Sequence, residues 1–494
     1  MGDQVFSGFG LGLVAGLMVV ICLLSTTTQA QTAEWVPGPD DGKGKRLVIN
    51  QVKLVGNKRT KDRIILRELQ LEPGTNVKLA DTAKFFRYEC NKVFNTKLFN
   101  FVSIQVQRYR ANSDTSIADT TDLILNMSER WYFFPAPVFE LADRSFNEWV
   151  YNRGASLSRV NYGIRVNQYN TFGYNDPASF TFQTGFARSY ELAYSFPILN
   201  KKLNTGITAR VSYTTNKYIA LATVDNKQKF DTASGPLGRT RFNASTSVSR
   251  RVGFFQTHVL TVNYDQNTIP EDFAAKNPDY FLDGRTYQQY LTLSYLFVYD
   301  YRNIRYYPTK GWYLVSALDV LGVLPGDNNR MLNIDVAVSK FFDLGGKWYS
   351  AHRLEVILSS PNQQSYLTSQ GMRYGRYGIR GYELYLVEGP QLFINRNSLR
   401  RKLLTKVFNL DSFFGWKQFN KVPIEIYAKT YADCGFVNAP FATPSNGRLS
   451  NRFLMGGGFG LDIATFYDLI FKMEYSWNQL GDKPGFFVGM SYDI

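Results

Sequence analysis

Apolar and polar residues alternate along most of the chain from residue 133 to its end. In the segment 204–214 the apolar residues share one face, and Thr, Arg and Ser residues stand between them. The segments 290–300 and 469–479 repeat this alternation with more aromatic residues on the apolar face. Successive side chains of a β-strand point to opposite faces, so a period of two residues predicts strands with one apolar and one polar face.

We predict sixteen strands, near residues 134–142, 159–170, 178–186, 190–197, 205–217, 240–252, 257–268, 286–301, 311–323, 330–343, 347–360, 390–403, 422–435, 452–467, 469–481 and 484–494. Apolar and polar residues also alternate in the strands of a soluble β-sandwich, but an even number of strands with aromatic-rich apolar faces is typical of an outer-membrane barrel. The long links, expected on the extracellular side, are residues 218–239, 269–285, 361–389 and 436–451. Residues 404–421 should form a long periplasmic turn with a short helix.

Residues 47–132 follow a different pattern, that of one small α/β domain. A strand ends at the turn Gly56-Asn57, and Thr60 is expected to cap a helix over residues 61–71. A second helix should start at Asp81 or Thr82 and be followed by two alternating strands. Basic residues outnumber acidic ones in this segment. A basic face could bind lipid phosphates or acidic client proteins, or it could be only a solvated charged surface.

The first 30 residues are typical of a secretory signal peptide, with an apolar run and a small-residue site that predicts cleavage after Ala30. No basic residue precedes the run, so an uncleaved anchor or a misassigned start codon is the alternative. Residues 31–46 are rich in Pro, Gly and Asp and should form a flexible leader.

Composition narrows the class of protein. Aromatic residues make up 16% of the 494 residues, and the mean hydropathy is −0.24. After the leader no stretch has the roughly 18 apolar residues of a membrane-spanning helix. The net charge of +15 is spread among acidic residues without a nucleic-acid-binding motif, so we expect contact with anionic lipids or acidic clients and no nucleic acid.

Cysteines and histidines provide no candidate for a catalytic site, a metal site or a cofactor. Cys22 lies in the expected signal peptide, and Cys90 and Cys434 fall in different expected domains. His258 is followed two residues later by Leu260 and His352 by Leu354, and not by serine, which argues against an outer-membrane lipase. We therefore expect a protein that is not an enzyme and carries no cofactor or metal.

Three features together resemble a known family. The strand and helix order of residues 47–132 is similar to that of a polypeptide-transport-associated (POTRA) domain. The sixth loop on the expected extracellular side contains Arg380, Gly381 and Tyr382, and the thirteenth strand contains the sequence YADCGFV. With a sixteen-stranded barrel, these features resemble the BamA/TamA superfamily of outer-membrane protein insertases. The resemblance implies that the loop folds into the lumen, where its arginine meets Asp433 of the aromatic-x-Asp-x-Gly pattern that ends at Gly435.

The alternation along the thirteenth strand supports this interpretation independently. Asp433 shares a face with Lys429 and Tyr431, whereas Ile424 and Ile426 lie on the other face, so Asp433 should point into the lumen. We expect Arg380 to pair with Asp433, Gly381 to permit a tight turn and Tyr382 to pack against the wall. A solvated lumenal carboxylate is the alternative for Asp433.

The first and last strands carry a second signal. The final strand resembles the C-terminal signal of barrel proteins in Gly489, Tyr492 and Ile494. The first strand contains Pro135 and Pro137, which cannot donate hydrogen bonds to a ladder. We expect a weak seam between these strands that opens sideways to a client strand; alternatively, the prolines only end the linker.

The predicted fold is therefore an all-β, sixteen-stranded antiparallel transmembrane β-barrel (133–494) preceded by one small α/β POTRA-like domain (47–132). The predicted function is insertion of β-barrel proteins into the bacterial outer membrane, with the small domain in the periplasm. Expected partners are unfolded outer-membrane proteins, periplasmic chaperones or assembly lipoproteins, and outer-membrane lipids. A translocation pore for one secreted partner and a non-inserting accessory barrel are the alternatives.

Overall fold

The computed structural model describes most of the chain after the leader. It covers residues 46–94, 96, 98–111, 118–143, 146–196, 205–232, 238–252, 255–303, 307–369, 371–372, 378–409, 421–441, 447–465, 470–481 and 485–490. The expected signal peptide, the leader up to residue 45, Tyr492 and Ile494 lie outside the described residues.

The N-terminal part is a small α/β domain with a mixed four-stranded sheet in the order β2-β1-β4-β3. Its elements are β1 (Arg46–Val55), α2 (Asp62–Leu66), β2 (Asn76–Lys78), the 3-10 turn η2 (Leu79–Asp81), α3 (Thr82–Phe94), β3 (Phe99–Arg110) and β4 (Asp119–Glu129). Strand β1 runs parallel to β4, and β3 runs antiparallel to β4. Alternate residues of the strands and the apolar stripe of α3, including Phe86 and Cys90, form one buried core. Burial raises the pKa of the Cys90 thiol to about 11.

The first helix of this domain differs from the sequence-based expectation. Helix α2 ends at Leu66 instead of residue 71, and Lys61, not Thr60, occupies the N-cap without a side-chain hydrogen bond. The Thr60 hydroxyl instead lies within hydrogen-bonding distance of Tyr132 and Asn170. The prediction that Thr60 caps the helix was wrong, because buried partners in other elements compete for its hydroxyl group.

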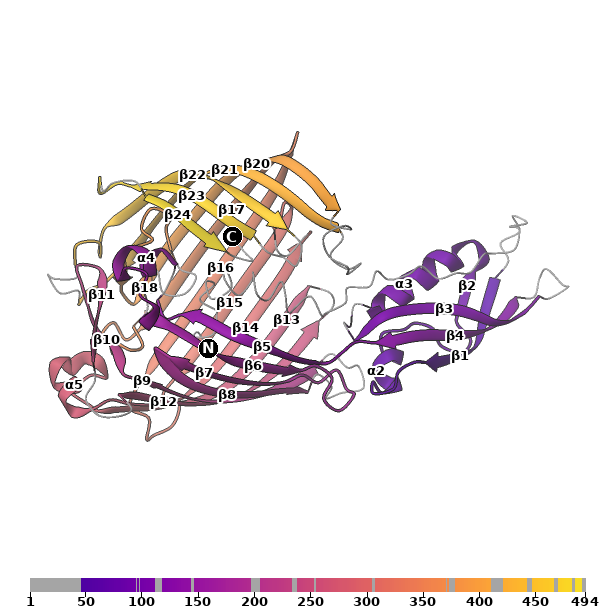
Figure 1. The fold of residues 1–494 in the computed structure, drawn as a ribbon, viewed down its shortest axis with the longest axis horizontal. Coiled ribbons are helices and arrows are strands. Elements are labelled where there is room, and N and C mark those ends of the chain that lie inside the picture. The colour runs from indigo at the N-terminus through magenta and orange to yellow at the C-terminus, as the bar shows by residue number, and fades with distance from the viewer. Residues whose placement is uncertain are drawn as a thin grey trace.

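Sixteen antiparallel strands form one continuous sheet, as the alternation predicted. They are β5 (Phe133–Leu141), β6 (Val160–Gln168), β7 (Ala178–Gly185), β8 (Ala187–Phe196), β9 (Thr205–Asn216), β12 (Arg239–Val252), β13 (Gln256–Thr268), β14 (Tyr287–Arg302), β15 (Gly311–Leu321), β16 (Met331–Gly345), β17 (Trp348–Ser360), β20 (Gln391–Asn409), β21 (Lys421–Asn438), β22 (Phe453–Thr465), β23 (Ile470–Asn478) and β24 (Gly485–Met490). Each strand pairs with the next in this series, and the sheet curls into a barrel with the small domain beyond one end (Figure 1).

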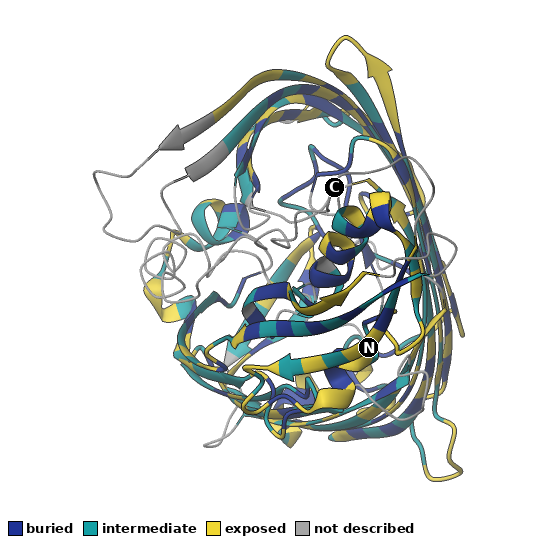
Figure 2. Cartoon of the chain, turned by 90° about the vertical axis from the view of Figure 1, so that its right-hand side faces the viewer, coloured by how far each residue is buried: buried dark blue, intermediate teal, exposed yellow. Residues whose placement is uncertain are grey.

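Burial alternates along the strands, as seen from the end that carries the small domain (Figure 2). In β16, for example, the residues from Met331 to Phe341 alternate between a buried and a more exposed position. Exposed tyrosine, phenylalanine and tryptophan residues such as Tyr295 and Phe459 lie on the outer face. Charged side chains such as Lys429 and Asp462 are buried on the inner face. The barrel thus has an apolar outer wall and a polar lumen.

Helices and short hairpins lie at the barrel end opposite the small domain (Figure 1). They comprise α4 (Phe146–Arg153), the 3-10 turn η3 (Leu157–Arg159), the hairpin β10 (Tyr218–Val224) and β11 (Lys227–Thr232), α5 (Glu271–Lys276), the 3-10 turn η4 (Pro278–Tyr280), and β18 (Gly371–Met372) with β19 (Val387–Glu388). Phe273, Tyr280 and Phe281 form a buried cluster with Ile219 of β10, so these loops pack against one another.

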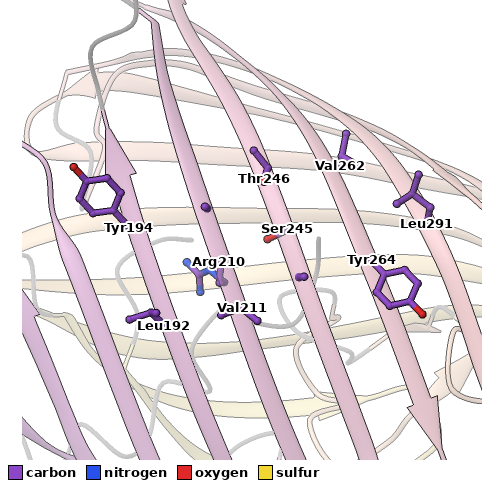
Figure 3. A pocket seen from close by; sticks show the side chains of 11 residues that line it. Leu192, Tyr194, Arg210, Val211, Ser245, Thr246, Val262, Tyr264 and Leu291 are labelled. Atoms are coloured by element: carbon purple, nitrogen blue, oxygen red, sulfur yellow. The ribbon is translucent and has the colours of Figure 1, made fainter.

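Three further observations complete the fold. Strand β20 continues to Asn409 and β21 begins at Lys421, so residues 404–409 are strand, not turn; the expected short helix lies otherwise outside the described residues. None of the helices in the described part of the chain has the length and apolar character needed to cross a membrane. A shallow apolar depression with a volume of about 400 Å³ lies on the wall around Leu192, Val211 and Val262 (Figure 3). These side chains belong to the exposed apolar face, so the depression is part of the outer wall.

Candidate functional site: a loop held inside the barrel and an unpaired seam

Arg380 lies in the loop between β17 and β20, and the structure brings it together with Asp433 of β21. Its Nε donates a hydrogen bond to Asp433 Oδ2 (2.7 Å), and an Nη atom donates one to Oδ1 (2.6 Å). The Arg380 backbone N–H donates to the same carboxylate (3.1 Å). Arg380 is 4% exposed and Asp433 is 3% exposed. This two-pronged arrangement in a buried setting is the strongest form of arginine–carboxylate contact.

Other barrel groups use the remaining donors of Arg380. One Nη donates to Ser398 Oγ (3.0 Å), and the other also donates to the Asn397 carbonyl (3.1 Å) of β20. The guanidinium lies 3.9 Å from the ring centre of Tyr431. Arg380 is therefore bound by two strands and an aromatic face, so its removal would affect more than one contact.

The pair belongs to a larger network of charges on the inner wall. Lys429 of β21 contacts Asp462 of β22 (2.5 Å) and Glu474 of β23 (2.7 Å). Glu474 is 3.9 Å from Arg380, and Arg396 is 3.8 Å from Asp433. The sequence analysis placed Lys429 on the same face as Asp433 but did not connect it to Asp462 or Glu474. Strand parity indicates which way a side chain points, whereas its partner depends on the register between strands.

Gly381 and Gly435 provide the space in which the loop lies. Gly381 has a φ of +94°, and a Cβ atom there would lie 2.4 Å from the Trp477 carbonyl oxygen. The Gly381 carbonyl accepts a hydrogen bond from Asn478 (2.8 Å). A Cβ atom at Gly435 would lie 2.6 Å from the Phe393 carbonyl oxygen and 2.7 Å from the side chain of Ile379. Neither position could hold a larger residue without movement of the loop or the wall.

Tyr382 is fully buried and belongs to an apolar cluster with Ile379 and residues of β20, β21 and β22. Burial of an aromatic side chain provides a large apolar contribution to loop attachment, which adds to the ion pair. The structure thus places the three consecutive residues in three environments: Arg380 in a polar network, Gly381 against a strand backbone and Tyr382 in an apolar cluster.

The first and last strands form the two edges of the sheet. Within the described residues, no ladder joins β5 to β24. Pro135 and Pro137 lie in β5 opposite Val166 and Ile164 of β6. Gly489 lies in β24 opposite Lys472, and a Cβ atom there would make only an ordinary contact at 3.9 Å. The steric demand seen at Gly381 is therefore absent at Gly489.

Two elements near the site were missed by the sequence analysis. Helix α4 contacts β24, and the hairpin β10–β11 contacts the loop that carries Arg380. The Leu386 N–H donates to the Asn226 carbonyl (2.7 Å), and Asn226 Nδ2 donates to the Leu386 carbonyl (3.0 Å). Alternation of apolar and polar residues in 218–232 could have indicated the hairpin, whereas the eight residues of α4 are too few for a helical pattern to stand out.

The small domain is attached to the barrel at the turn between β6 and β7. Thr60 lies between the hydroxyl of Tyr132 (3.2 Å) and Asn170 Nδ2 (2.9 Å), and all three side chains are buried. The Lys61 N–H donates to the Gly173 carbonyl (2.9 Å). Burial raises the pKa of Tyr132 to about 12, so its hydroxyl stays protonated at neutral pH. The domain is thus held to the barrel by specific contacts as well as by the connecting chain.

Comparison with known proteins agrees with this architecture. A family model described as the Omp85 superfamily domain matches residues 170–394. The chain is therefore similar to the Omp85 superfamily over these residues, in agreement with the resemblance expected from the loop and strand motifs. A comparison with curated proteins gave no match.

Solved structures show the same fold at low sequence identity. BamA from Haemophilus ducreyi lacking POTRA domains 1–3 matches with a TM-score of 0.60 and 14% identity, over 97% of this chain and 93% of that chain. CdiB from Escherichia coli matches with a TM-score of 0.52 and 12% identity, over 97% of this chain and 83% of that chain. These likenesses show the fold of the chain, a sixteen-stranded β-barrel preceded by a small α/β domain.

Proposed function

We propose that this protein inserts β-barrel proteins into the bacterial outer membrane by offering an edge of its own sheet to an incoming strand. The observation that carries this proposal is the sixteen-stranded sheet, in which no ladder joins the described residues of the first and last strands. An unpaired strand edge presents backbone N–H and C=O groups, which can bind another strand by β-augmentation. The similarity of residues 170–394 to the Omp85 superfamily domain supports the proposal.

The loop that carries Arg380 has a structural role in this proposal. Its contacts extend over β20, β21, β22 and β23, the strands next to the seam. A loop bound to these strands can hold them in register while the β24 edge is unpaired. Arg380, Gly381 and Tyr382 thus act as a latch on the C-terminal part of the wall, with Asp433 and Gly435 as its receptor. No catalysis, nucleotide, cofactor or metal is involved.

The small domain resembles a POTRA domain in the order of its elements, and we propose that it lies in the periplasm. Its clients would be unfolded outer-membrane proteins, delivered by periplasmic chaperones or assembly lipoproteins. Outer-membrane lipids would contact the apolar outer wall. The docking of Thr60 and Lys61 on the β6–β7 turn would transmit the position of the domain to the first strands of the barrel.

Reconstitution tests the proposal directly. The full-length protein in lipid vesicles should accelerate folding of an urea-denatured eight-stranded outer-membrane barrel, measured as the heat-modifiable folded fraction on gels. Vesicles that contain a porin without an Omp85 domain provide the control. Folding of the probe at the same rate in both preparations would contradict the proposal.

Secretion of a dedicated partner is the second candidate, because the fold also matches CdiB. Depletion in the native bacterium separates the two functions. An insertase should lower the amounts of many different barrel proteins in the outer membrane. A secretion pore should leave these unchanged and abolish export of one protein.

A further inference from the structure

The two edges of the seam differ in their capacity to bind a strand. At either end of the β5–β6 ladder, Tyr169 N–H donates to the Tyr132 carbonyl (2.8 Å) and Ala142 N–H donates to the Arg159 carbonyl (2.9 Å). The ladder between them has no register shift. Alternate residues of a strand direct their backbone groups to opposite sides, so the even-numbered residues of β5 pair with β6. Pro135 and Pro137 therefore face the free edge, where both lack an N–H.

The β24 edge retains these donors and acceptors. The Val488 N–H donates to Asn147 Oδ1 (3.3 Å), and the Val488 carbonyl accepts from Asn147 Nδ2 (3.3 Å). The Phe486 carbonyl accepts from the hydroxyl of Tyr151 (3.0 Å). Residues 486 and 488 thus direct their backbone groups away from β23 and toward helix α4.

Asn147 makes the two hydrogen bonds that a residue of a neighbouring strand would make. An amide side chain carries one acceptor and two donors, so it can satisfy both the N–H and the C=O of one strand residue. Tyr151, one helical turn later, contacts the next edge residue and also packs its ring against Phe487 (6.3 Å between ring centres). Helix α4 thus occupies two successive binding positions of the β24 edge.

The opposite side of α4 is attached more firmly. Arg153 donates to the Gln228 carbonyl of β11 (2.8 Å), and its pair with Glu148 (3.2 Å) lies within α4 itself. Its guanidinium also lies 5.0 Å from the ring centre of Phe230. The hairpin that carries Gln228 in turn contacts the latch loop at Leu386. Helix α4 could therefore leave the β24 edge and remain attached to the hairpin.

We propose that β24, and not β5, is the edge that binds an incoming strand, and that α4 is a displaceable cap on it. In the resting protein Asn147 and Tyr151 satisfy the edge groups of Val488 and Phe486. An incoming strand replaces them with its own backbone groups, while the prolines of β5 prevent that edge from competing. The identity of the incoming strand rests on the proposed function; the cap itself stands on the contacts at β24.

Amide hydrogen exchange tests the cap without any client. The double variant Asn147→Ala/Tyr151→Phe should raise exchange of the Val488 amide about tenfold, the effect expected when one or two hydrogen bonds are lost. The Phe487 and Gly489 amides, which belong to residues of the opposite parity that face β23, should not change. Asn152→Ala is the matched control, because Asn152 lies on the same helix but bonds to Glu148. Equal exchange of Val488 in the double variant and the control would overturn the cap.

A reversible tether tests displacement. Asn147→Cys and Val488→Cys, in a chain with Cys90→Ala and Cys434→Ala, can be joined by a disulfide and released by reductant. The oxidised protein should fold the eight-stranded probe at least about tenfold more slowly than the reduced protein, because pairing at the β24 edge is blocked. Equal rates before and after reduction would overturn displacement of α4. Heat-modifiable mobility checks that the tethered barrel is folded.

The two tests separate this inference from the proposed function. If the untethered protein does not accelerate folding of the probe, the proposed function fails, and the exchange of Val488 still decides whether α4 caps β24. If the probe folds and photo-crosslinks to β5 instead of β24, the proposed function stands and the choice of β24 is overturned.

Discussion

The latch loop and helix α4 both lie outside the barrel sheet and bind to its C-terminal strands, but the chemistry of their contacts differs. Arg380 reaches Asp433 through charged hydrogen bonds of 2.6 and 2.7 Å in a buried site. Asn147 reaches Val488 through two neutral bonds of 3.3 Å. Bonds between charged partners at short distance are roughly twice as strong as neutral ones.

This difference means that the two contacts on the same wall should respond differently when they are broken. Breaking the buried ion pair leaves an uncompensated charge, whereas breaking the α4 contacts exposes backbone groups that water or another strand can satisfy. The latch is therefore suited to remain in place, and the cap is suited to leave. Four variants test this contrast, described from the largest expected effect to the smallest.

Asp433→Ala should have the largest effect. It leaves Arg380 buried without its main counterion, at a cost of about 3–5 kcal/mol. We expect less folded barrel in the membrane and a lower midpoint of denaturant unfolding. Asp265→Ala is the control, because it removes a carboxylate paired with the more exposed Arg241 of β12. Unchanged heat-modifiable mobility and unchanged insertion of the probe would refute the latch.

Gly381→Ala should cost about 1–3 kcal/mol, because it combines a positive φ with a close approach to the Trp477 carbonyl. The midpoint of unfolding measures the loss. Gly74→Ala provides a matched control, since Gly74 has a φ of +90° but nothing within 4 Å of the added Cβ atom. If both variants lose the same stability, backbone strain alone explains the loss in Gly381→Ala, and the close approach to β23 contributes nothing.

Arg153→Met should loosen α4 locally, because it removes the hydrogen bond to Gln228 and the pair with Glu148. Hydrogen bonds of charged groups contribute about 1.5–3 kcal/mol each, so exchange of the α4 amides should rise clearly while global unfolding changes little. Lys276→Met, which breaks an exposed pair with Asp231, is the control. A large fall in global stability would show that α4 is a structural part of the barrel.

Pro135→Ala with Pro137→Ala should have the smallest effect on stability, below about 1 kcal/mol, because the main change is in the entropy of the unfolded chain. The two new N–H groups face the free edge of β5 and allow it to pair with β24. We expect a few-fold slower folding of the probe barrel in the reconstituted assay. Pro270→Ala, at the start of α5, is the control. Faster folding of the probe would indicate that β5 binds the incoming strand.

Much of the wall could be predicted from the sequence. Alternation is a local property, so the number of strands and the inward direction of Asp433 followed from it. The position of Arg380 could not be predicted from alternation, because a loop has no regular period. A resemblance to a family suggested that Arg380 meets Asp433, and the structure places these two side chains together. The Thr60 prediction failed for the opposite reason: its local pattern was correct for a cap, but more distant partners bind its hydroxyl group.

The sequence by itself determined which residues face the lumen, because the side chains of a strand alternate whatever its neighbours are. Only the tertiary structure decided in which direction the backbone groups of the two seam strands point. The prolines of β5 are visible in the sequence, but the side to which they point depends on the hydrogen-bonding phase of the β5–β6 ladder. The contact between Asn147 and Val488 joins residues 341 positions apart. Such a contact exists only once the sheet has curled, since no local pattern records the distance between the two ends of a barrel.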